Sequence, residues 1–371
     1  MSEAGTPGAS ATRPYRVACI GAARMASWFD DVQRERAASD GGRSLEWVPG
    51  AIAPLCRAIE RAELVAVCDL KPDLVEQMRQ RWDVPAGYTD WREMVARERP
   101  DVVAIVTAYG SIHATLGAEV AETGLVRGIY CEKPIATSMA EADRIVAACR
   151  ANGVAYTCAH VARWNARYRQ VCDWIAAGEI GEVRAVTVSA MGTLLHSGTH
   201  QTDAMAGFAG DVDPEWASGV VEVPAGLPQA EWPMQDPPGG GHIRLRNGVD
   251  LLMEARSPGP RTYQISGSEG KIHIWNDLQQ IQLWKRIPGR GRAELAPGPL
   301  LSPPQERSYA QTQLEELLDV LDRDGKGQIG CDAARAARAL EMVLGLHLSH
   351  RAGGARVPFP LADRAFGVDT K

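Results

Sequence analysis

A carboxylate and an ammonium follow one another at the end of a short apolar segment. Glu132 and Lys133 come directly after Ile129–Cys131 and before Pro134. The apolar segment predicts a strand, which Pro134 ends because proline cannot donate a backbone hydrogen bond. The chain has six lysines and thirty-four arginines, so arginine carries most of its basic charge. Lysine, unlike arginine, gives up its proton when burial lowers its pKa. The position of Lys133 therefore predicts proton transfer; a surface lysine after a core strand is the alternative.

Two histidines four residues apart, His196 and His200, supply groups that titrate near neutrality. His200 belongs to the pattern Gly198-x-His200-x-x-Asp203. On a helix both imidazoles would share one face, and such a pair binds a metal only with a further protein ligand. Asp203 and His242 are the candidates for that ligand. We favour acid–base chemistry at His200 and predict no metal.

The segment GAARMA at residues 21–26 follows the apolar segment 15–20 and is a degenerate form of the dinucleotide-binding pattern GxGxxG. Small residues there let backbone N–H groups approach a pyrophosphate at a helix N-terminus. The next strand-like segment ends at Asp69, an acidic residue suited to the hydroxyls of an adenosine ribose. Asp69 comes later than the usual spacing of about 20 to 30 residues. The excess predicts an insertion at Ser39–Pro54, at the cofactor end of this domain.

The order of the predicted elements indicates two domains. Strand-like and helical segments alternate through residues 15–158, which predicts a Rossmann domain with a doubly wound parallel sheet. Residues 159–371 predict an α+β domain with an open, mostly antiparallel sheet that serves substrate binding and oligomerisation. Residues 1–14 are small and polar and are predicted to be a disordered tail.

Turn signals and proline content refine the second domain. Asn247-Gly248 predicts a hairpin, and the sequence GSEG at residues 267–270 predicts another. The proline-rich segments 224–238 and 288–304 are predicted to be surface loops, and two helices are expected at 306–321 and 332–350.

Composition excludes several classes of partner. A chain of 371 residues with a net charge of −6 and no basic block argues against nucleic acid. No apolar segment approaches the roughly 18 residues of a membrane span. The eight cysteines form no CxxC pair, and the first residues lack the apolar core of a signal peptide. These features predict a cytoplasmic protein.

Three motifs give the chain a resemblance to the Gfo/Idh/MocA (glucose–fructose oxidoreductase / inositol dehydrogenase) family. They are the tripeptide Glu132-Lys133-Pro134, Thr107 followed six residues later by His113, and Gly198-x-His200-x-x-Asp203. The resemblance implies a Rossmann domain followed by an open antiparallel sheet. It also implies NAD as cofactor, with NADP as the alternative, and hydride transfer at a hydroxyl or ketone carbon of a sugar, sugar derivative or cyclitol.

Site residues follow from the resemblance by position. Lys133 and His200 correspond to the catalytic acid/base pair. The cofactor-binding set is Gly21, Ala23, Arg24, Met25, Asp69, Thr107, Ala108, Tyr109, His113, Glu132 and Lys133. The substrate-binding set is Arg163, Trp164, Asn165, His196 and Asp203.

The chain departs from the family pattern at three places, which leaves other functions open. Alanines replace two glycines of the nucleotide fingerprint, Ala108 stands where proline is common, and His196 stands where many members have aspartate. One alternative is an enzyme that cleaves a glycosidic bond by transient oxidation with tightly held NAD. Another is a non-catalytic regulator that senses the cofactor; the presence of both Lys133 and His200 argues against it.

An open sheet also predicts a homodimer or homotetramer, because a face without helices needs a cover. Alternating apolar residues are the expected contacts between copies, namely Ile272, Ile274, Ile281 and Leu283.

Overall fold

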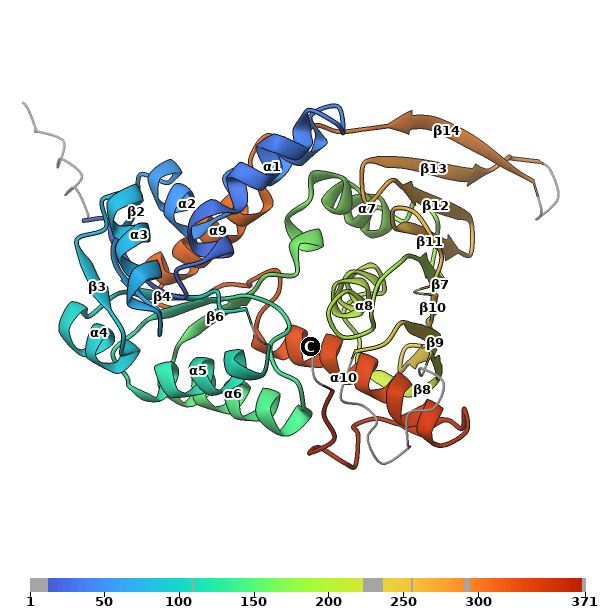
Figure 1. The fold of residues 1–371 in the computed structure, drawn as a ribbon. Coiled ribbons are helices and arrows are strands. Elements are labelled where there is room, and N and C mark those ends of the chain that lie inside the picture. Colours follow the sequence, from blue (N-terminus) through green and yellow to red (C-terminus); the bar gives the residue numbers. More distant parts are fainter. Residues whose placement is uncertain (1–12, 109, 223–235, 255, 290–293, 369–371) are drawn as a thin grey trace, which may run out of the picture.

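The computed structural model describes residues 13–108, 110–222, 236–254, 256–289 and 294–368. The first part of the chain forms a six-stranded parallel sheet in the order β3-β2-β1-β4-β5-β6 (Figure 1). Its strands are β1 Tyr15–Ile20, β2 Ala62–Cys68, β3 Ala86–Tyr88, β4 Val102–Ile105, β5 Gly128–Cys131 and β6 Ala155–Cys158. All residues of β4 and β5 are buried, as expected for parallel strands covered on both faces. The predicted Rossmann sheet is confirmed.

Helices cover both faces of this sheet. One face packs against α4 Trp91–Glu98, α5 Gly110–Glu122 and α6 Met139–Asn152. The other face packs against α2 Ile52–Ala58 and α3 Pro72–Trp82, next to α1 Phe29–Ala37. Local sequence sets the ends of α6: Ser138 and Glu141 form a capping box at its start, and Gly153 follows its end with a φ of 63°.

A late helix, α9 Tyr309–Asp322, returns to the first sheet. Leu314, Leu317 and Leu318 are buried in the same apolar cluster as Val17, Cys19 and Val102 of the parallel strands. The predicted division at residue 158 therefore follows the chain order, whereas the packed Rossmann unit also includes α9.

The second sheet has nine strands in the order β14-β13-β12-β11-β7-β10-β9-β8-β15. Its strands are β7 Val183–Ser189, β8 Pro214–Val221, β9 Gly239–Leu245, β10 Asp250–Glu254, β11 Thr262–Gly267, β12 Gly270–Trp275, β13 Gln280–Arg286, β14 Leu295–Leu301 and β15 Val357–Pro358. Every neighbouring pair is antiparallel except β7 with β10. Both predicted hairpins are confirmed, with Gly248 at a φ of 84° between β9 and β10.

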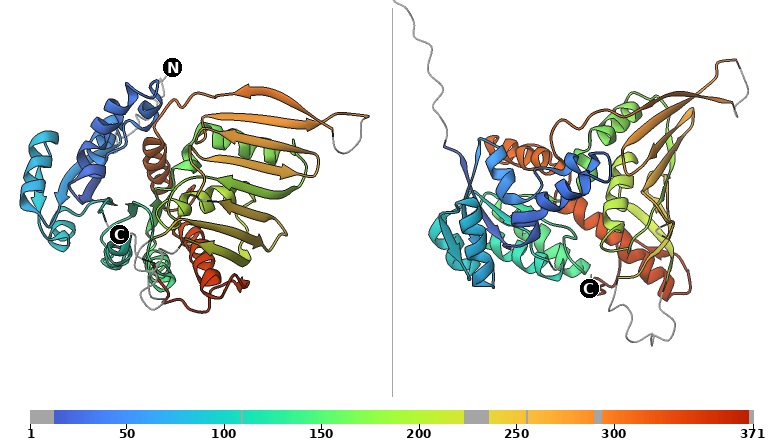
Figure 2. Two further views of the ribbon diagram at one scale, coloured as in Figure 1. Left: turned by 45° about the vertical axis from the view of Figure 1, so that its right-hand side comes forward. Right: turned by 45° about the horizontal axis from the view of Figure 1, so that its top comes forward.

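One face of the second sheet is covered by helices and the other is open (Figure 2). The covering helices are α7 Ala166–Ala176, α8 Gly198–Phe208 and α10 Ala333–Arg351. Helix α10 also contacts α6, so it joins the two domains.

The structure corrects the residues expected on the open face. Ile272, Ile274 and Ile281 are fully buried within one copy of the chain, because they point toward the helices. Strand alternation places His273, Trp275 and Trp284 on the opposite face, where they are only partly buried. Leu283, the fourth predicted contact, pairs with Ile272 and packs partly buried against the same core. The predicted homo-oligomer remains a prediction.

The proline-rich segment 288–304 is a second correction, since it contains β14 instead of forming only a loop. Strand β14 lies at the edge of its sheet, where Pro297 and Pro299 need no donor toward a further strand. Segment 224–238 lies outside the described residues except for its last three positions, and so does most of the tail 1–14. Among the described residues, no helix is long and apolar enough to cross a membrane.

Candidate active site

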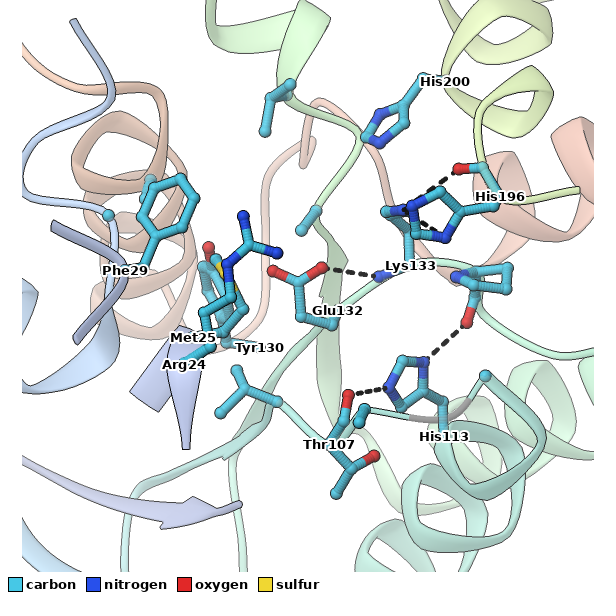
Figure 3. A pocket seen from close by; sticks show the side chains of 18 of the residues that line it. Arg24, Met25, Phe29, Thr107, His113, Tyr130, Glu132, Lys133, His196 and His200 are labelled. Carbon is cyan, nitrogen blue, oxygen red and sulfur yellow. Dashed lines mark hydrogen bonds between the residues drawn. The ribbon is translucent and has the colours of Figure 1, made fainter. Parts of the chain in front are cut away.

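A cavity of about 500 Å³ lies between the two domains, at the carboxyl ends of β1, β4, β5 and β6. This is the edge at which ligands bind in open α/β sheets. Ten predicted site residues line it: Ala23, Arg24, Met25, Thr107, Ala108, His113, Glu132, Lys133, His196 and His200. Figure 3 shows Arg24 and Met25 on one side and Lys133, His196 and His200 on the other. Tyr109 lies outside the described residues.

Gly21 and Asp69 form the turn beneath this cavity. Gly21 has a φ of 105°, and a Cβ there would lie 2.9 Å from the carbonyl oxygen of Val106. Only glycine fits this close approach of two strand ends. The Asp69 carboxylate accepts hydrogen bonds from the N–H groups of Ala22, at 2.9 Å, and Lys71, at 3.0 Å. Asp69 therefore lies beside the fingerprint turn.

The residues of the fingerprint fit a dinucleotide despite its two alanines. The backbone N–H groups of Ala23, Arg24 and Met25 have no acceptor among the described residues, and they begin a helical segment that continues into α1. Free N–H groups at a helix start attract phosphate. The Thr107 hydroxyl is buried and also lacks a partner within the described chain. Together these donors form a cradle that suits a pyrophosphate and a nicotinamide.

His113 ties the two strand-end loops together. Its Nδ1 lies 2.8 Å from the carbonyl oxygen of Pro134, and its Nε2 lies 3.2 Å from that of Thr107. A carbonyl oxygen only accepts, so each ring nitrogen bonds to its carbonyl when it carries a proton. The buried ring thereby holds the loop after β4 against the loop after β5, which carries Lys133.

Lys133 contacts His196 on the same side of the cavity. Its Nζ lies 3.2 Å from both ring nitrogens of His196 and donates to the His196 carbonyl oxygen at 3.1 Å. Burial lowers the pKa of Lys133, and the opposing effect of Glu132 is smaller. Burial and the charges of Lys133 and Arg24 lower the pKa of His196. The pKa of Lys133 is therefore shifted toward neutral pH, where a proton-transfer group works best.

His196 precedes the helix that carries His200. Residues 194–197 form a turn and α8 begins at Gly198, so the two imidazoles do not share a helix face. The Asp236 carboxylate, which the sequence did not bring to attention, fixes this turn by accepting from the N–H groups of Leu195 and His196, both at 2.7 Å. Burial raises the pKa of Asp236.

His200 lies in the first turn of α8 and is less exposed than His196. Burial, followed by the charge of Lys133, holds the pKa of His200 well below its usual value. Its Nδ1 is buried without a partner in the described structure. The ring is therefore a neutral imidazole, with one donor and one acceptor nitrogen.

Four predicted substrate contacts have partners away from the cavity. The Arg163 guanidinium binds Asp203 through Nε at 2.9 Å and Nη2 at 2.8 Å, and it also binds Asp211. The Trp164 indole donates to Glu316 at 2.8 Å, and Asn165 caps α7. None of Arg163, Trp164, Asn165 and Asp203 is part of the cavity lining. Their placement supports the walls of the site.

A buried cluster of His160, Asp203 and Cys331 brings three potential metal-ligating atoms within 4.8 Å of one another. Arg163 Nη2 already lies 2.8 Å from the Oδ1 atom of Asp203 that such a metal would use. A second cation there would be repelled. Burial also raises the pKa of the Cys331 thiol, which keeps it protonated. Hydrogen bonds of the Cys331 thiol with His160 and Asp203 explain why the three side chains lie together without a metal.

The insertion at 39–54 connects the domains at the rim of the cavity. It contains the short 3-10 helix Arg43–Trp47, from which Trp47 lines the cavity and packs edge-on against Tyr309. Glu46 accepts two hydrogen bonds from Arg167 of α7, at 2.6 and 2.9 Å, and one from the Tyr309 hydroxyl. The insertion thus builds a wall shared by both domains, a role that the sequence left open.

Replacing Glu46 with glutamine is expected to lower the free energy of unfolding by about 1.5 to 3 kcal/mol, the scale of hydrogen bonds to charged groups. Arg167 is 3% exposed and would lose its carboxylate partner. Although burial raises the pKa of Glu46, hydrogen bonds from Arg167, Gln279 and Tyr309 lower it overall. Its contribution is therefore present above the unfolded pKa of about 4.3 and is lost as the pH falls through the folded value. Thermal unfolding at neutral and acidic pH measures this, with Glu35→Gln, on the exposed side of α1, as control. Equal melting temperatures for both variants would contradict it.

Tyr309 and Arg261 are among the cavity residues that were absent from the predicted site. Tyr309 begins α9, and Arg261 immediately precedes β11. Neither stands in a motif, and both reach the cavity only because distant segments pack together.

Comparison with known proteins shows which family part of the chain is similar to. The model described as "Oxidoreductase family, NAD-binding Rossmann fold" (Gfo/Idh/MocA) matches residues 46–160, a range that includes Asp69, Thr107, His113, Glu132 and Lys133. This likeness covers less than a third of the chain. Gly21 and His200 lie outside the matched range, so their roles depend on the structure.

Relatives match about a third of this chain. Inositol 2-dehydrogenase of Salmonella paratyphi B is 28% identical over 130 residues, which cover 34% of this chain and 38% of that protein. D-apiose dehydrogenase of Paraburkholderia graminis is 32% identical over 125 residues, which cover 34% of this chain and 32% of that protein. The chain thus matches less than two fifths of the length of either relative.

A solved structure extends the likeness to the whole fold. The WlbA dehydrogenase from Bordetella pertussis, in complex with NADH and UDP-GlcNAcA, superposes with a TM-score of 0.69 and 20% identity, covering 94% of this chain and 100% of that one. At this identity the similarity establishes the fold alone.

Proposed function

We propose that the protein is an NAD-dependent dehydrogenase that acts on a hydroxyl or ketone carbon of a sugar, sugar derivative or cyclitol. The observation that carries the proposal is the position of Lys133 and His200 in one cavity with the nucleotide turn. The names of the relatives, inositol 2-dehydrogenase and D-apiose dehydrogenase, agree with this substrate class.

The cofactor, when bound, would supply a nicotinamide carbon that exchanges hydride with the substrate. Gly21, Ala23, Arg24 and Met25 would hold its pyrophosphate, and Asp69 would contact its adenosine ribose. Thr107, Ala108, His113 and Glu132 would hold the nicotinamide end; the contribution of Tyr109 stays a prediction.

The protein's own groups divide the remaining work. Lys133 binds the reacting oxygen and takes or gives its proton, because its pKa is lowered toward the working pH. The pKa of His200 is well below its usual value, so the ring acts as an uncharged hydrogen-bonding group that orients the same hydroxyl. His196 and Trp47 also line the cavity, so they limit the size of the substrate groups next to that hydroxyl. This assignment moves proton transfer from a shared pair to Lys133.

The test is direct. Purified protein is mixed with NAD and a panel of sugars and cyclitols, and NADH absorbance is followed. We expect stoichiometric NADH with at least one member of the panel. Product formed without net NADH would favour transient oxidation instead, and no binding of NADH at all would contradict the proposal.

NAD is expected to bind more tightly than NADP. The Asp69 carboxylate is fixed by two backbone N–H groups, and its charge would repel a 2′-phosphate. Dissociation constants for NADH and NADPH measure the preference, and Asp69→Asn should reduce it because the amide keeps an acceptor but loses the charge. Tighter binding of NADPH by the unmodified protein would refute this prediction.

A further inference from the structure

Arg261 enters the cavity from the second domain. It precedes β11, lines the cavity with Lys133 and His200, and its side chain is 21% exposed. Its Nε donates to the Asp277 carboxylate at 2.5 Å. Within the described part of the chain no carboxylate or carbonyl accepts from its two Nη atoms, and the Tyr263 hydroxyl lies beside the guanidinium. This edge borders the cavity, where a ligand can reach it.

The charges that line the cavity are unbalanced. Its cations are Arg24, Lys133 and Arg261, whereas Glu132 is its one carboxylate among the described residues. Arg24 lies over the Phe29 ring, 5.2 Å from its centroid, on the cofactor side. The substrate side therefore holds Lys133 and Arg261, and the pKa of each imidazole there is lowered, chiefly by burial.

Arg261 is close enough to act on the reacting groups. Burial is the largest cause of the lowered pKa of both Lys133 and His200, and the charge of Arg261 is among the smaller causes in each case. A ligand whose hydroxyl meets Lys133 can therefore reach the guanidinium with another of its groups. If the ligand were a neutral polyol, the Arg261 guanidinium would meet only hydroxyl oxygens and no negative charge.

We propose that the substrate carries a carboxylate that binds the free edge of Arg261 while its reacting hydroxyl meets Lys133, so that the enzyme acts on a sugar acid. This inference rests on the proposed function and narrows its substrate class. The planar pair of N–H donors matches the two oxygens of a carboxylate. In the reaction the secondary alcohol loses hydride to NAD and its proton to Lys133, and the carboxylate is unchanged.

A single negative charge suits this site better than a phosphate dianion. Asp277 already offsets part of the charge of Arg261, and one edge of the guanidinium remains. A phosphate would bring a third oxygen and a second charge without a matching donor. Sugar phosphates are thus the natural competitor in the test.

The experiment uses the full chain and pairs of compounds that differ at one carbon. The pairs are D-glucuronate with D-glucose, D-galacturonate with D-galactose, and glucose 6-phosphate as the phosphate arm. Turnover is read from NADH formation in the presence of NAD. Binding is measured separately by calorimetry on protein saturated with NADH, which cannot oxidise the sugar. The binding arm therefore decides the proposal even if no compound is oxidised.

We expect the acid of at least one pair to bind and react better than its neutral partner by ~10- to 100-fold, the ratio for hydrogen bonds to a charged group. Arg261→Gln should remove this preference, and Arg261→Lys should restore part of it. Asp277→Asn should keep the preference, which controls for disruption of the loop.

Three results would overturn the inference: equal binding of acid and neutral sugars to the unmodified protein, a preference for the phosphate over the acids, or an acid preference that survives in Arg261→Gln. Acid-specific binding without any hydride transfer would instead support Arg261 as an anion site and contradict the proposed dehydrogenase.

Discussion

Replacing Lys133 with alanine is expected to lower kcat by roughly 10² or more, the scale of lost general acid–base catalysis. The ammonium sits at the cavity with its pKa lowered by burial, and among the described residues no other lysine lines the cavity. NADH affinity should change little, because the backbone groups of the fingerprint turn are untouched. Steady-state kinetics and fluorescence titration with NADH separate these two effects.

The pH profile gives a sharper readout of the same residue. Oxidation of an alcohol releases a proton, so kcat should rise with pH as Lys133 loses its own proton. The midpoint should lie below the usual lysine value of about 10.4, because burial disfavours the charged form. This limb should vanish in Lys133→Ala. Hydride transfer at the unmodified rate in that variant would remove the basis of the proposed mechanism.

Variants of His200 distinguish orientation from proton transfer. His200→Ala is also expected to lower kcat by roughly 10², since the substrate hydroxyl loses a fixed partner. His200→Gln retains a neutral donor and acceptor and should recover much of that loss. If glutamine is as damaging as alanine, His200 carries the proton and the assignment to Lys133 is wrong. His196→Ala, at the rim of the cavity, should mainly raise KM.

Replacing Asp203 with asparagine is expected to lower the free energy of unfolding by about 3 to 5 kcal/mol, the cost of breaking a buried ion pair. Asp203 is 0% exposed at its side chain and makes two hydrogen bonds with the Arg163 guanidinium. The change would leave that guanidinium short of one carboxylate. Denaturant unfolding at neutral pH measures the loss.

The effect should depend on pH in a defined direction. Burial raises the pKa of Asp203, but Arg163 and His160 outweigh it and hold the pKa well below the usual value. A depressed pKa contributes stability above the unfolded value of about 3.9, and that contribution is lost as the pH falls through the folded value. Asp211→Asn is the matched control, because Asp211 binds the same guanidinium but is 22% exposed and should cost less. Equal losses in both variants would contradict the buried-pair argument.

Much of the fold could be predicted from local sequence. Apolar segments such as Val102–Ile105 and Gly128–Cys131 fill both faces of a parallel strand, and Asn247-Gly248 forces a hairpin through its backbone preferences. The Glu132-Lys133-Pro134 motif was placed correctly because a strand end fixes where the following residues lie. These features depend on neighbours within a few positions in the chain.

Only the tertiary structure decided which faces and which distant segments meet. Strand alternation gives β12 two faces, but it does not say which one the helices cover, so Ile272 and Ile274 proved to be core residues. The sequence pattern placed Arg163 and Asp203 in the substrate site. In the structure they form a buried ion pair with each other, outside the cavity lining. Helix α9, the Glu46–Arg167 contact and Arg261 reach the first domain or the cavity across long stretches of chain. Such contacts form because burial and charge pairing are properties of the folded whole, and no local pattern records them.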